Sequence, residues 1–76
     1  MNKLLLKSKM AAAGDTAEKL AGILQITSQT FSAKINEKKA EFTQTEIEII
    51  AKRYNLTPDE LRDIFFSRLV SNEDTN

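Results

Sequence analysis

The sequence predicts an all-α fold, a compact bundle of about five short helices. Apolar residues recur three or four positions apart along most of the chain, and no segment shows the sustained alternation of a strand. Asp15, Thr43 and Thr57 are each followed three residues later by glutamate, a pattern that satisfies the free amide groups of a helix's first turn. A chain of 76 residues can build one domain with a modest core.

Each expected helix has an apolar face, and three have a start signal. The helices are expected over residues 3–13, 16–24, 28–36, 44–54 and 58–69. Asp15 is expected to cap the second helix, Thr43 the fourth and Thr57 the fifth. Pro58 then takes the first helical position, where its missing N–H is not needed.

Helices this short are not stable alone, so the fold depends on a shared apolar core. The expected core consists of Leu6, Met10, Leu20, Ala21, Leu24, Ile26, Phe31, Ile35, Phe42, Ile47, Ile50, Ala51, Tyr54, Leu56, Leu61, Ile64 and Phe65. Ile23, Ile49 and Phe66 fit these faces less well and are expected to be exposed, as a candidate partner surface. Residues 71–76 carry no apolar side chain and are expected to form a disordered tail after a domain of residues 1–70.

Composition excludes several classes of function. The chain has no cysteine and no histidine, which rules out disulfides and zinc sites built from thiolate or imidazole ligands. It offers no convergent nucleophile and base, so we expect neither an enzyme nor a cofactor. The apolar run Leu4 to Leu6 ends at Lys7 and is too short for a signal peptide or a membrane span. A cytoplasmic protein without a membrane partner is expected.

Charge is divided between the two halves of the chain, although the formal net charge is zero. Residues 1–39 carry seven basic and three acidic side chains, a net +4, and residues 40–76 carry four basic and eight acidic side chains, a net −4. One interpretation is a polar molecule whose basic end faces a polyanion. The other is a solvated surface without functional meaning, and charge alone does not separate the two.

Residues 16–36 have the layout of a helix-turn-helix. Ile26 is placed to fill the angle between the two helices, and Ala21 lies where they cross closely and only a small side chain fits. The outward residues of the second helix suit base edges in the major groove and are Ser28, Gln29, Ser32 and Ala33. The candidate phosphate ligands are Thr16, Lys19, Lys34, Asn36, Lys38 and Lys39. A polar surface helix without a ligand is the alternative interpretation of these residue types.

Two stretches resemble the lambda-repressor-like, Cro/C1-type regulators and the short Cro-like or modulator proteins of phages and prophages of Gram-positive bacteria. The first comprises Leu20-Ala21, the run Ile26-Thr27-Ser28-Gln29-Thr30-Phe31-Ser32 and Lys34-Ile35-Asn36. The second comprises Phe42-Thr43-Gln44-Thr45-Glu46-Ile47, Ile50, Tyr54-Asn55-Leu56-Thr57 and Ile64-Phe65-Phe66. The resemblance implies a positive φ at Gln25, where the family often has glycine. The family also often has glutamine at the position of Ala17, and the phosphate clamp which that glutamine provides is absent here. At the position of Glu37 the family often has glycine.

These features lead to two hypotheses. The first is a transcription regulator that binds operator DNA, a double-stranded partner, as a homodimer because one recognition helix reads only a few base pairs. The alternative is an antirepressor-like modulator whose main partner is a phage repressor protein. In that case Ile23 or Phe66 would anchor the contact, and the acidic side chains would engage a basic surface of the partner.

Overall fold

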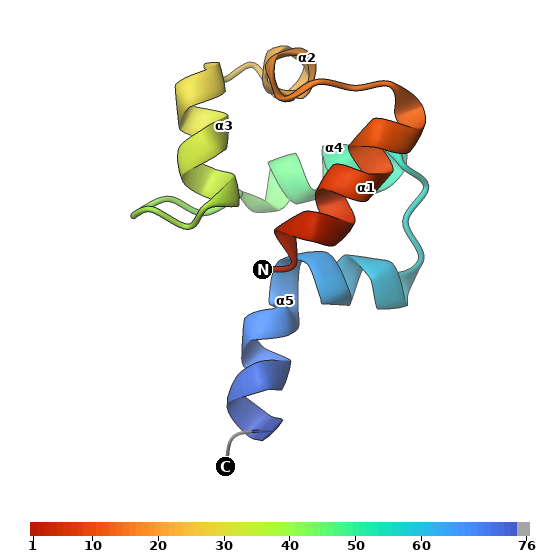
Figure 1. Cartoon of the computed structure of the whole chain (residues 1–76), viewed down its shortest axis with the longest axis vertical. Helices are drawn as coiled ribbons and strands as arrows, with labels where there is room; N and C mark the ends of the chain where they lie inside the picture. Colours follow the sequence, from red (N-terminus) through yellow and green to blue (C-terminus); the bar gives the residue numbers. More distant parts are fainter. Residues whose placement is uncertain (75–76) are drawn as a thin grey trace.

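The computed structural model describes the backbone of residues 1–74 and the side chains of residues 1–66 (Figure 1). Within that part the chain is helical and contains no strand. Its five helices are α1 (Lys3–Ala13), α2 (Ala17–Ile23), α3 (Ser28–Ile35), α4 (Gln44–Arg53) and α5 (Pro58–Asp74). The prediction of an all-α bundle of five helices is confirmed. No described helix is both long and apolar enough to cross a lipid bilayer.

Side-chain caps set the starts of the helices. Thr43 and Thr57 each exchange two hydrogen bonds with the glutamate three residues on, as predicted. The prediction that Asp15 caps α2 is wrong. Thr16 is the cap, and its Oγ1 accepts a hydrogen bond of 3.1 Å from the Lys19 amide. Asp15 is not available for capping because its carboxylate is buried against α4.

The core forms where all five helices meet. Its buried apolar side chains are Leu6, Met10, Leu20, Ala21, Leu24, Phe31, Ile35, Ile50 and Ile64. Phe42, from the α3–α4 connection, lies edge-on to both Phe31 and Phe65, with ring centroids 5.8 Å apart in each pair. This row of three rings ties α3 to α5.

The margins of the core differ from the expectation. Ile47 and Leu61 are only half-buried and lie outside the main apolar cluster. Ile23 and Ile49 are half-buried and pack against the core, so the expectation that they are exposed is wrong. Phe66 is 43% exposed, as expected.

Helix α5 changes direction at Phe66, whose φ of −125° and ψ of 16° are not helical (Figure 1). The helical backbone continues to Asp74, whereas the sequence predicted that this helix would end near residue 69. The expected tail of residues 71–76 overlaps the last turn of α5, and residues 75 and 76 lie outside the described part of the chain.

Candidate nucleic-acid interface

Helices α2 and α3 pack against each other and are joined by a short connection of residues 24–27 (Figure 1). The Ile26 amide donates to the Ala21 carbonyl at 3.0 Å, and the Ile26 side chain packs against the core as predicted. Gln25 has a φ of +61°, so the expected left-handed conformation is confirmed. Thr27 then caps α3, which fixes the angle at which α3 leaves the connection.

Helix α3 has one buried face and one polar, exposed face. Phe31 is 2% exposed and anchors the buried face in the core. The predicted base-reading residues lie on the other side: Ser28, Gln29 and Ser32 are exposed, and Ala33 is half-buried. These four residues therefore lie on the same side of α3, and the three polar ones are exposed to solvent.

The predicted phosphate ligands lie at both ends of the α2–α3 pair. Those exposed to solvent are Thr16, Lys19, Asn36, Lys38 and Lys39. Lys34 differs, because its side chain is only 12% exposed and its Nζ donates to Glu46 Oε1 at 2.6 Å. The ammonium of Lys34 is thus held at the start of α4 and does not project into solvent.

Glu46 is the centre of that contact. The same carboxylate oxygen that receives the Lys34 ammonium also accepts from the Thr43 amide at 2.9 Å. Burial raises the pKa of Glu46, but the hydrogen bonds from Lys34 and from the Thr43 amide outweigh burial and hold the pKa below its ordinary value. The pair fixes the C-terminal half of α3 to the first turn of α4.

A second polar link joins α3 to α1. The Lys3 Nζ donates to Asn36 Oδ1 at 2.9 Å, and the Asn36 amide nitrogen donates to the Ser32 carbonyl at 3.0 Å. Asn36 ends α3 as its C-cap. Lys3 and Asn36 are 33 residues apart, so no local pattern in the sequence could have placed Lys3 beside the predicted site.

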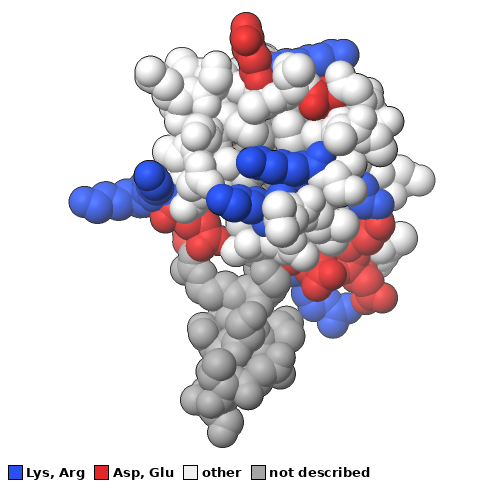
Figure 2. Space-filling view, viewed as in Figure 1, with Lys and Arg blue, Asp and Glu red and all other residues white. Residues whose placement is uncertain are grey.

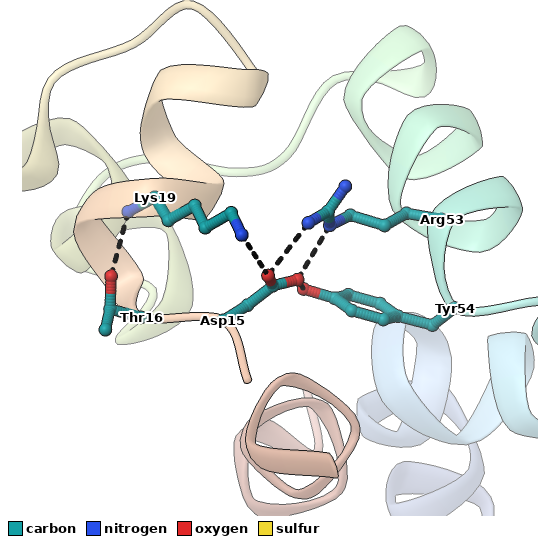
Figure 3. A network of polar contacts seen from close by, with 5 residues as sticks. All are labelled: Asp15, Thr16, Lys19, Arg53 and Tyr54. Carbon is teal, nitrogen blue, oxygen red and sulfur yellow. Dashed lines mark hydrogen bonds and ion pairs between the residues drawn. The ribbon is translucent and has the colours of Figure 1, made fainter. Parts of the chain in front are cut away.

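A buried carboxylate orients the start of α2 (Figure 3). Asp15 accepts two hydrogen bonds from Arg53, at 2.7 and 2.8 Å, and one from the Tyr54 hydroxyl at 2.7 Å. The Lys19 Nζ lies 3.6 Å from Asp15 Oδ1, and the Lys19 side chain is 59% exposed. The hydrogen bonds from Arg53 and Tyr54 hold the pKa of Asp15 well below its ordinary value, whereas burial raises the pKa of Tyr54 to about 12. This network was missed because its partners are distant in sequence.

The cations that make no ion pair are concentrated in two segments of the chain. Among the described side chains, those that make no ion pair are Lys3, Lys7, Lys38, Lys39 and Lys52. Four of these five belong to α1 and to the α3–α4 connection. Figure 2 shows basic side chains across the middle of one face, over α1, with acidic side chains gathered below them towards α5. The basic and acidic side chains are therefore partly separated on this face, although acidic side chains also lie above the basic band and basic atoms lie beside the lower acidic group.

Comparison of the chain with protein-family models, with curated proteins and with solved structures gave no match.

Proposed function

We propose that this protein is a DNA-binding transcription regulator of the lambda-repressor-like kind, in which α2 and α3 form a helix-turn-helix and α3 lies in the major groove. The observation that carries the proposal is the two-faced character of α3, which is buried on one side and presents short polar side chains on the other. The Gln29 amide matches the adenine N6/N7 edge, serine hydroxyls serve either base, and the Ala33 methyl can contact a thymine methyl.

The polar surroundings of α3 support contact with the DNA backbone. Lys38 and Lys39 are exposed and make no ion pair, at the point where the chain leaves α3. Thr16 is the N-cap of α2 and Lys19 lies in its first turn, and both side chains are exposed and of kinds that contact phosphate. Lys34 has a different part in this proposal, since its bond to Glu46 holds α3 against α4.

The proposal extends to a biological setting. A single α3 spans only a few base pairs, so the protein acts on operator DNA as a homodimer. The sequence resemblance favours a Cro-like regulator of a phage or prophage lysogeny switch, working in the cytoplasm where its operator lies.

One feature favours a second function, contact with a phage repressor protein. A cavity of about 260 Å³ opens beside the exposed Phe66. Its other lining residues are the apolar Met1, Phe42, Ile47 and Phe65 and the charged Lys34, Glu37 and Glu41. A hollow with an apolar part, a charged part and an exposed aromatic at its edge is typical of a protein-binding surface. Contact with a repressor through this hollow is compatible with base readout by α3, because none of the four predicted base-reading residues lines the hollow.

Base readout by Gln29 provides the test. Duplexes are selected from a random pool by the wild-type protein, and affinities for a selected and a scrambled duplex are measured at one salt concentration. Gln29→Ala should weaken binding to the selected duplex by about 1–3 kcal/mol and leave the scrambled duplex unchanged. Gln44→Ala, which alters an exposed glutamine in the first turn of α4, should leave this preference intact.

The outcomes separate the two functions. Failure of the wild-type protein to bind any duplex would contradict the DNA-binding proposal. Binding only in the presence of a neighbouring repressor, or removal of that repressor from its operator, would favour the second function. Equal loss on both duplexes in Gln29→Ala would assign Gln29 to a backbone contact.

A further inference from the structure

We propose that Lys3 of α1 contacts a DNA phosphate on the same surface as α3, and that Asn36 positions Lys3 instead of contacting phosphate itself. This inference rests on the proposed function and adds to it a residue from another helix. The sequence predicted Asn36 as one of six phosphate ligands and did not include Lys3.

The position of the Lys3 ammonium carries the first step. Its hydrogen bond of 2.9 Å to Asn36 Oδ1 places it at the C-terminal end of α3. An ammonium has three N–H donors, and this bond uses one of them. Lys3 is exposed and makes no ion pair within the described side chains, so its remaining donors face solvent at the end of the proposed recognition helix.

The bonding of Asn36 carries the second step. Its amide nitrogen donates to the Ser32 carbonyl at 3.0 Å and lies 3.4 Å from the Ser32 hydroxyl oxygen. Its amide oxygen accepts from Lys3 and, as an acceptor, cannot bind an anion. Lys3 offers a full positive charge at the same place, and charged donors form the stronger bonds to phosphate.

The surrounding charges carry the third step. Two acidic groups of this region, Glu37 and Glu46, bind the Met1 amino group and Lys34 respectively. Those carboxylates are therefore compensated without drawing on Lys3. With Lys38 and Lys39 on the following connection, three cations without an ion pair lie at or just after the C-terminal end of α3. A polyanion that meets this end of α3 encounters positive charge from two separate segments of the chain.

The salt dependence of DNA binding tests the inference. Fluorescence anisotropy of a labelled selected duplex is measured for each variant between about 50 and 200 mM salt. Lys3→Gln should reduce the slope of log K against log salt by about one unit and weaken the selected and scrambled duplexes by the same factor. Lys52→Gln, which removes an exposed cation without an ion pair from α4, should leave slope and affinity unchanged. Thermal melting of each variant verifies the fold.

A double variant tests the role of Asn36. In the Lys3→Gln background, Asn36→Ala should cause no further loss of affinity, because Asn36 acts through Lys3. Losses that multiply would mean that Asn36 contacts DNA independently and would overturn its positioning role. An unchanged slope in Lys3→Gln, with a reduced slope in Lys39→Gln, would overturn the inference and leave the proposed function standing. Absence of salt-dependent binding by the wild-type protein would overturn both.

Discussion

Several non-glycine residues of this fold adopt the left-handed backbone conformation, which raises the energy of the folded state. Non-glycine residues with positive φ are Gln25, Glu37, Lys39 and Asn55. Gln25 lies in the connection between α2 and α3, at φ +61°, and its side chain is exposed. The Cβ of an L-residue is crowded in this region, whereas glycine adopts it freely.

Gln25→Gly is therefore expected to stabilise the protein by about 0.5–1 kcal/mol, because relief of strain exceeds the added entropy of the unfolded chain. Urea unfolding of both proteins measures the difference. The matched control is Gln29→Gly, which places glycine inside α3 and should destabilise by about 1 kcal/mol. A lower urea midpoint for Gln25→Gly would show that the connection is not strained.

Acid is expected to weaken the fold in large part through Asp15, with Glu46 and Glu60 acting in the same direction because their pKa values are also lowered. The folded pKa of Asp15 is depressed by Arg53 and Tyr54, so its contribution to stability is fully present above the ordinary pKa of 3.8 and is lost as the pH falls towards the folded value. Melting temperatures should decline below about pH 4, and less steeply in Asp15→Asn than in the wild-type protein. Asp63→Asn, at an exposed position without an ion pair, should keep the wild-type pH profile.

Residue-scale prediction from sequence succeeded where the signal is local and failed where the partner is distant. The capping boxes of Thr43 and Thr57 are local, and both were predicted. The positive φ at Gln25 was anticipated from the family resemblance, because the family often has glycine at this position. Three features were missed: the bond from Lys34 to Glu46, the bond from Lys3 to Asn36, and the bonds from Arg53 and Tyr54 to Asp15. Their partners are 12 to 39 residues apart in the sequence. A single sequence contains no signal for which charged groups the packing of helices will bring together.

At the scale of elements, the starts of the helices are the features that the sequence specifies best. The acceptor and the glutamate of a capping box lie three residues apart, so both halves are visible in the sequence. Asp15 misled because Thr16, directly after it, is an equally good cap, and burial of the carboxylate decided between them. The end of α5 carried no stop signal, and its helix runs past the expected bound.

The cap of α4 should be measurable on its own. Thr43→Ala removes the acceptor for the Glu46 amide and should cost about 1 kcal/mol of stability, determined by urea unfolding. Thr45→Ala, two positions on and exposed within the same helix, serves as the control and should be neutral or slightly stabilising. Equal effects of the two substitutions would mean that the capping box contributes nothing measurable.

For the whole molecule, the row of Phe31, Phe42 and Phe65 joins elements that are far apart in the chain. The apolar faces of the sequence predicted the fully buried residues of the core, but neither its margins nor the edge-on contacts of these three rings. Periodicity determines which side of a helix is buried and says nothing about the rings that meet there.

Phe31→Ala is expected to lower the stability of the entire domain by about 3–5 kcal/mol, a large part of what a small domain possesses. Circular dichroism at 222 nm on heating should show one transition at a much lower temperature, or no folded baseline. Phe66→Ala removes a ring of the same size from an exposed site and should melt close to the wild-type protein. Similar melting of both variants would contradict the assignment of Phe31 to the core.

The separation of charge across the surface gives the molecule an electric dipole without a net charge (Figure 2). In a uniform field such a body feels no pull, only a torque that turns it. Close to a polyanion the field is steep, and it would both turn the molecule so that α1 and the α3–α4 connection lead and draw it inward. This field is felt within about a Debye length of the polyanion, near 8 Å at physiological ionic strength. The molecule would thus be aligned before its first contact, and salt would act on that alignment as well as on affinity.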